Sequence, residues 1–194
     1  MLKIKLLSFS AILLLTLSGC VFNDTIHKGV GLGVGSGDEL FFGTVKLHNV
    51  IYKNIVINGT ARLDNVFVAE QLGVNGNLSA NKTTIGAMTV NGNADLQKVT
   101  VKGLSAFNGY LQAKDSSFGK IIFGTRNAIL SDSTTKLITV RKEENITEQI
   151  IELDNTKVDG DIVFEGGNGK VLLKGDSEVV GKINGGILIP VKPC

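Results

Sequence analysis

Residues 57–76 read INGTARLDNVFVAEQLGVNG, and this stretch starts and ends on one pattern, a β-branched residue two positions before a glycine. The pattern, with an aromatic residue in some copies, recurs at glycine-to-glycine intervals of 16, 17, 16, 17 and 15 residues. Its copies are Phe41-Phe42-Gly43, Ile57-Asn58-Gly59, Val74-Asn75-Gly76, Val90-Asn91-Gly92, Phe107-Asn108-Gly109 and Ile122-Phe123-Gly124. Such a period is typical of repeat proteins, in which each repeat stacks on the one before it.

Each repeat contains three apolar positions, separated by steps of five or six residues. Along the regular part of the chain they are Ile57, Leu63, Val68, Val74, Ala80, Ile85, Val90, Leu96, Val101, Phe107, Ala113 and Phe118. Short alternating flanks around them indicate strands, and the abundant Val, Ile and Thr favour strands as well. We therefore predict an all-β fold, a three-sided, single-stranded β-solenoid (β-helix) with coils of about 16–17 residues.

Asparagine recurs near the expected corners of the coils. Asn-Gly pairs suit tight turns, because both residues tolerate a positive φ. Asn49 and Asn65 follow the apolar residues Leu47 and Leu63 by two positions, and Asn81 follows Ala80 by one. They could form a hydrogen-bonded ladder along one corner of the solenoid, or they could be ordinary surface turn residues, and the sequence leaves both open.

The regular pattern weakens after Gly124. A charge-rich stretch near 141–149 predicts a loop that bulges from one corner. The pattern resumes at Ile150, and Pro190 and Pro193 suit a capping end because proline cannot donate to a strand ladder. We therefore expect the solenoid domain to span residues 41–194.

The first residues have the parts of a secretory signal. Met1 to Lys5 is short and basic, and Leu6 to Thr16 is almost wholly apolar. That apolar run is shorter than the roughly 20 residues needed to cross a bilayer core. We predict a signal peptide over residues 1–19. Residues 20–40 then form a glycine-rich tether, because glycine orders at a high entropic cost and favours flexible linkers.

The tetrad Leu17-Ser18-Gly19-Cys20 resembles the lipobox of bacterial lipoproteins. The resemblance implies cleavage before Cys20, a diacylglyceryl thioether on its thiol and often a further acyl chain, such as palmitate, on its amine. Several acyl chains would anchor the protein to membrane lipid almost permanently. In such lipoproteins, an Asp directly after the cysteine favours retention in the inner membrane. This chain has Val21 at that position, so the resemblance implies the outer membrane of the cell envelope in a Gram-negative host. The alternative is an ordinary signal peptide that ends beside a cysteine.

The charge balance argues against a nucleic-acid partner. The chain has 20 Lys and Arg and 18 Asp and Glu, and removal of Lys3 and Lys5 with the signal leaves 18 of each sign. Binding to nucleic acid would need a basic excess on the folded domain. With Cys20 lipidated, Cys194 has no internal partner, so it would form an intermolecular disulfide or remain an idle thiol.

We find no catalytic, metal or cofactor motif, and we predict that the protein is not an enzyme. Zinc-type spacing of Cys and His is absent, and the two histidines, His27 and His48, fall on the tether and on the outer surface of a strand. Asp159 and Asp161 could form an acid pair or bind a cation, although a solvated turn is the simpler interpretation. The three arginines, Arg62, Arg126 and Arg141, share no position in the repeat.

Between residues 41 and 189, the Ile/Val-x-Gly recurrence and the three-strand coils resemble the bactofilins, bacterial polymer-forming proteins. The resemblance implies a right-handed helix and end-to-end assembly into filaments. The lipobox departs from that family. The expected function is a structural, scaffolding or self-assembling lipoprotein of the cell envelope, with a homo-oligomer, an envelope protein or a glycan as partner. The alternative is a surface adhesin or glycan-binding module that uses one face of the helix.

Overall fold

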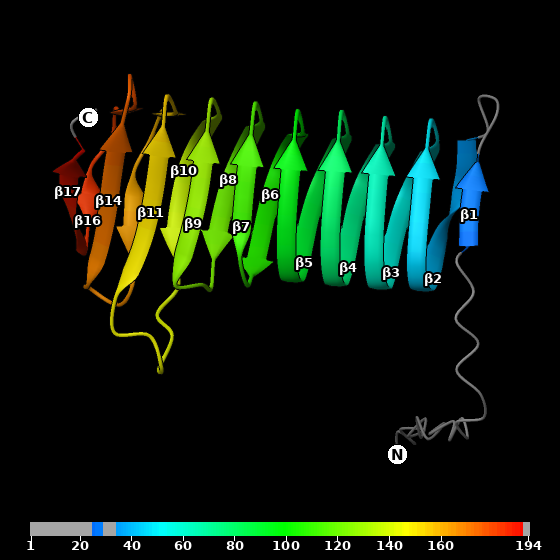
Figure 1. Ribbon diagram of the computed structural model, residues 1–194, viewed down its shortest axis with the longest axis horizontal. Helices are drawn as coiled ribbons and strands as arrows, with labels where there is room; N and C mark the ends of the chain where they lie inside the picture. Colours follow the sequence, from blue (N-terminus) through cyan, green and yellow to red (C-terminus); the bar gives the residue numbers. More distant parts are fainter. Residues whose placement is uncertain (1–24, 29–33, 192–194) are drawn as a thin grey trace, which may run out of the picture.

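The computed structural model describes residues 25–28 and 34–191. In this part of the chain, parallel strands stack into a β-solenoid of about 9 turns, and no helix is present. Figure 1 shows the coils side by side along one axis, with β1 at one end of the rod and β17 at the other. At a strand spacing of about 4.8 Å the rod is roughly 40 Å long. The predicted fold class is confirmed.

The strands wind in chain order, and each pairs with strands one coil away. Their bounds are β1 Thr25–Lys28, β2 Val34–His48, β3 Ile51–Asp64, β4 Phe67–Asn81, β5 Thr84–Gln97, β6 Thr100–Asn108, β7 Leu111–Lys114, β8 Ser117–Phe123, β9 Asn127–Ser131, β10 Thr134–Val140, β11 Gln149–Asp154, β12 Lys157–Val158, β13 Ile162–Phe164, β14 Gly169–Lys174, β15 Glu178–Val179, β16 Ile183–Asn184 and β17 Gly186–Pro190.

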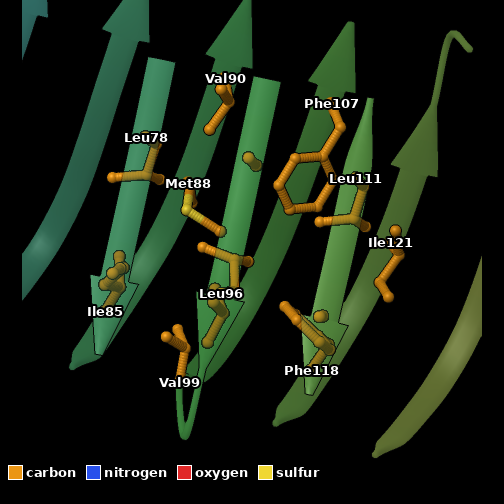
Figure 2. Packing of buried hydrophobic residues seen from close by; sticks show 14 of the residues in the cluster. Leu78, Ile85, Met88, Val90, Leu96, Val99, Phe107, Leu111, Phe118 and Ile121 are labelled. Carbon is orange, nitrogen blue, oxygen red and sulfur yellow. The ribbon is translucent and has the colours of Figure 1, made fainter. Parts of the chain in front are cut away.

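Each coil has three sides. We number them from one coil, in which side 1 comprises residues 54–58, side 2 residues 60–64 and side 3 residues 66–68. Each side buries two side chains, as Ile55 and Ile57 do on side 1. The sequence predicted one of the two, and all twelve apolar positions named for the stretch from Ile57 to Phe118 are buried. Figure 2 shows such side chains, including Met88 and Phe107, filling the space between the walls.

The corner between sides 1 and 2 requires glycine. Gly59, Gly76 and Gly92 are in register with one another along the rod. Gly92 has a φ of 141°, and a Cβ built there would lie 2.1 Å from the carbonyl oxygen of Gly76. The coils therefore approach too closely at this corner for any larger residue.

An asparagine ladder runs beside this glycine column on the outer surface of side 1. Asn75 donates to Asn58 at 2.7 Å, Asn91 donates to Asn75 at 2.7 Å, and Asn108 donates to Asn91 at 2.6 Å. Repetition of one residue in register thus lets each amide satisfy the next one.

The corner between sides 2 and 3 is a left-handed turn made by residues other than glycine. Asn49, Asn65 and Lys82 have φ values of 55°, 53° and 48°. Asn65 donates to Asn49 at 2.7 Å, so the first step of the predicted ladder is present. The prediction that Asn81 continues this ladder is wrong, because Asn81 is in register with Asp64 and donates to it at 2.8 Å. Lys82 occupies the corner position instead.

Two further features differ from the sequence prediction. Gly124 does not stack on Gly109, because Phe123 is in register with Phe107 and Gly124 therefore lies beside Asn108. In addition, β2 begins at Val34 and pairs with β3, so strand pairing starts before residue 41. Backbone hydrogen bonds need no side chains, which allows a glycine-rich segment to join the ladder.

The coils lengthen towards the C-terminal end. Hydrogen-bonded positions on neighbouring coils are 17 residues apart for Ser116 and Ser133, 23 apart for Ser133 and Thr156, and 21 apart for Thr156 and Ser177. The connection between β10 and β11, residues 141–148, accounts for the longest coil and projects from the rod in Figure 1. Gln149 fixes its base, since the buried side-chain amide donates to the carbonyl oxygens of Thr125 and Arg141.

Candidate interaction surfaces

The residues predicted for lipid attachment lie outside the described residues. They are Cys20 and the motif residues Leu17, Ser18 and Gly19, together with Cys194 as the candidate for an intermolecular disulfide. Their roles stay predictions. The other candidates lie on the rod.

His48 lies on the outer surface of β2, next to the buried Leu47, as the sequence predicted. Its Nδ1 lies 2.8 Å from a carboxylate oxygen of Asp64, and its Nε2 lies 2.8 Å from the amide nitrogen of Asn49. A carboxylate therefore orients the imidazole, but an amide occupies the nitrogen that would activate a nucleophile. This arrangement links two coils at the surface.

Asp159 and Asp161 serve different partners. Asp159 forms an ion pair with Lys157 at 3.3 Å, and Asp161 accepts the backbone N–H of Lys182 from the next coil at 2.8 Å. No group of three or more His, Cys, Asp or Glu that could hold a metal ion occurs in residues 25–28 and 34–191. The geometry thus favours the surface-turn interpretation of this pair.

The arginines are exposed and scattered, as the sequence indicated. Arg62 lies on side 2 in register with Ser79, Arg126 lies just before β9, and Arg141 follows β10. They do not form a common basic surface. The described part of the chain also contains no helix that is long and apolar enough to span a membrane.

The N-terminal end of the core contains a partly buried tyrosine. Tyr52 is in register with the buried Val68, and its ring makes an edge contact with Phe41 at a centroid distance of 6.2 Å. Burial raises the pKa of the Tyr52 hydroxyl, and the negative charge of Glu39 raises it further. The neutral phenol is therefore the form that this end of the rod favours.

The C-terminal end leaves part of the core uncovered. Leu188 on β17 is in register with the fully buried Val171, yet it is 43% exposed because no described coil follows it. Pro190 lies on the free edge of the same strand. The N–H of its neighbour Val191 points back to Leu173, so the nitrogen of Pro190 faces outward and offers no donor there. A proline in this position blunts an open sheet edge.

The chain matches no protein-family model, no curated protein and no solved structure. The class is therefore defined by the geometry alone, and it is the three-sided, single-stranded β-solenoid.

Proposed function

We propose that this protein is a non-catalytic, lipid-anchored structural element of a bacterial cell envelope, and that it acts as a scaffold by associating with copies of itself. The observation that supports this most strongly is the rod itself. Almost every inward position, from Val45 to Val171, holds an apolar side chain in one continuous core. The surface groups His48 and Asp161 are engaged in contacts that join neighbouring coils, and Asp159 is paired with Lys157 of its own coil.

A glycan-binding role has less support. Binding of sugars along one face would need aromatic side chains in a row on that face. Within residues 38–191, the exposed aromatic residues are Phe42, Phe67 and Tyr110, and they lie on three different sides of the rod.

Lipid attachment is tested on the full-length protein in a bacterial host, by metabolic labelling with a palmitate analogue and by membrane fractionation. We expect label and membrane association in the wild type and the loss of both in Cys20→Ser. A wild-type protein that carries no label would overturn the anchor.

Self-association is tested by sedimentation of the lipidated protein in detergent, with and without reductant. We expect species larger than the monomer that persist in reductant and in Cys194→Ser. A strict monomer would overturn the scaffold. A dimer that is lost both in reductant and in Cys194→Ser would show that the association is only a disulfide through Cys194.

A further inference from the structure

Side 1 has an outer surface that differs from the rest of the rod. One column of outward residues follows its centre and includes Val56, Gly73, Thr89, Ala106, Ile122 and Thr139. We call this column the central stripe. It contains no charged residue from Leu40 to Val163, although 20% of the whole chain is charged. By contrast, the matching column on side 2 carries Lys46, Arg62, Asp95 and Glu152.

The positions beside the central stripe are also uncharged over several coils. On one flank lies the asparagine ladder from Asn58 to Asn108. On the other flank Asn54, Gln71 and Ala87 are in register, and Leu104, in the next coil, is 42% exposed. Charges lie at the ends of these flanks. Asp38 is in register with Asn54, whose amide also donates to Glu70 at 3.2 Å, and Lys120 is in register with Leu104. Arg141 lies further along the rod. An uncharged centre with charges near its margins is the usual composition of a protein–protein interface.

We propose that side 1 is a lateral interface and that a second copy of this chain covers it. The inference deepens the self-association of the proposed function by naming the surface that mediates it. The ladder amides support this choice of partner. Each internal amide, such as that of Asn75, uses one donor and one acceptor within the ladder, which leaves one N–H and acceptor capacity for a partner.

The coils of a second copy have the same spacing as these unused donor and acceptor groups. The amides recur at the spacing of the coils, about 4.8 Å, and the same spacing recurs on any other copy of the rod. Donors and acceptors of two copies can therefore stay in phase along the whole contact. Two uncharged stripes can also meet without the repulsion that like charges would cause.

The available area is sufficient for a specific contact. Five residues of strand across side 1 span about 16 Å, and the rod is roughly 40 Å long, which gives about 650 Å² on each copy. Two copies would bury about 1,300 Å² in total, within the range of stable protein interfaces. Attachment of all copies to one membrane through Cys20 would raise their local concentration further.

The blunted C-terminal edge also favours a lateral contact over an end-to-end one. Pro190 removes a donor from the edge strand that an added coil would have to pair with. A contact through side 1 needs no backbone donor, because the strands of side 1 are already paired within the rod and side chains alone would form the contact.

The test is a charge placed at the centre of the stripe of the full-length, lipidated protein in detergent. Thr89→Lys puts an ammonium group on the central stripe, and Ser79→Lys puts the same group on the exposed surface of side 2. Because an interface would have to bury this charge, we expect Thr89→Lys to weaken self-association at least about tenfold in sedimentation. Ser79→Lys should behave as the wild type does.

Two further measurements keep the outcome decisive. Circular dichroism and thermal unfolding check that Thr89→Lys is folded, and Val56→Lys, at a 41% exposed position on the same stripe, replaces it if it is not. In a Cys194→Ser background, a flexible bis-maleimide, which adds to two thiols without an oxidant, should link copies through Thr89→Cys and not through Ser79→Cys.

Each result separates the lateral interface from the scaffold as a whole. Oligomers that survive a folded lysine variant on the central stripe would overturn the lateral interface and leave self-association standing. Equal sensitivity to Ser79→Lys would overturn it too. A monomeric wild type would overturn both proposals. If that monomer also pelleted with peptidoglycan, and Thr89→Lys prevented this, the partner of side 1 would be a glycan and not a second copy.

Discussion

The backbone N–H of Ser116 donates a hydrogen bond to Oγ of Ser133, one coil further on, at 3.0 Å inside the rod. The left-handed corner at Asp115, with a φ of 52°, interrupts the regular strand ladder just before this N–H. Ser133 Oγ in turn donates to the carbonyl oxygen of Ser131 at 2.6 Å. The same arrangement continues with Thr156 and Ser177, so a column of buried hydroxyls replaces the missing backbone pairing.

Ser133→Ala should destabilise the protein by about 1–3 kcal/mol, because it leaves the buried N–H of Ser116 without an acceptor. The free energy of unfolding from urea titration measures the effect. Ser79→Ala, on the exposed surface of side 2, is the control and should change the value by less than about 0.5 kcal/mol. An unchanged stability in Ser133→Ala would show that this hydrogen bond contributes little.

Ser105→Ala should have the opposite effect. Ser105 is fully buried in register with Met88 and Ile121, and its Oγ has no hydrogen-bond partner in the described structure. Removal of this hydroxyl should raise the free energy of unfolding by about 1 kcal/mol, since an unsatisfied buried polar group is costly. Ser133→Ala is the matched variant, because the same chemical change at a satisfied hydroxyl should destabilise. A loss of stability in Ser105→Ala would contradict the prediction.

Gly92→Ala should be severely destabilising. Its Cβ would meet the backbone oxygen of Gly76, and its φ of 141° is strained for any residue with a side chain. We expect a loss of about 3 kcal/mol or more in thermal or urea unfolding. Gly73→Ala is the control, because its Cβ would lie 3.6 Å from the nearest atom of Val56, an ordinary contact. Similar losses in both variants would argue against the tight glycine corner.

Lys82→Asn should stabilise the corner between sides 2 and 3. Lysine is unfavourable in a left-handed conformation, whereas asparagine tolerates it. The new amide would also stack beyond Asn65 and extend the bond between Asn65 and Asn49. We expect a gain of about 0.5–1 kcal/mol in urea unfolding. Lys82→Ala should show no such gain, and equal stability of the two variants would exclude the ladder as the cause.

The raised pKa of Tyr52 predicts a loss of stability at alkaline pH. A raised pKa means that the folded state favours the neutral phenol, so its contribution is complete below the unfolded value of about 10 and disappears as the pH rises through the folded value. Between about pH 8 and about pH 11, Tyr52→Phe should therefore lose less stability than the wild type.

The titration of Tyr52 can be measured directly. The chain has two tyrosines and no tryptophan, so tyrosinate absorbance of Tyr110→Phe reports Tyr52 alone. Tyr110 is exposed on the outer surface, and Tyr110→Phe is also the control for the stability measurement. A pKa of Tyr52 at or below the ordinary tyrosine value would contradict the prediction.

The sequence by itself determined the repeat and the core. Inward positions such as Ile57, Leu63 and Val68 must be apolar in every coil, and this demand leaves a period that is readable along the chain. Glycine at the corner of Gly76 and Gly92 is equally readable, because no other residue fits the close approach of the coils.

Only the tertiary structure decided which residues of different coils become neighbours. A corner that gains or loses one residue changes the register, which is why Asn81 pairs with Asp64 and Gly124 lies beside Asn108. Outward residues face solvent and obey no strict pattern, so the uncharged stripe on side 1 becomes visible only after the coils are stacked. The buried hydroxyl column is hidden for a similar reason, since Ser116 and Ser133 are polar residues whose burial depends on bonds to other coils.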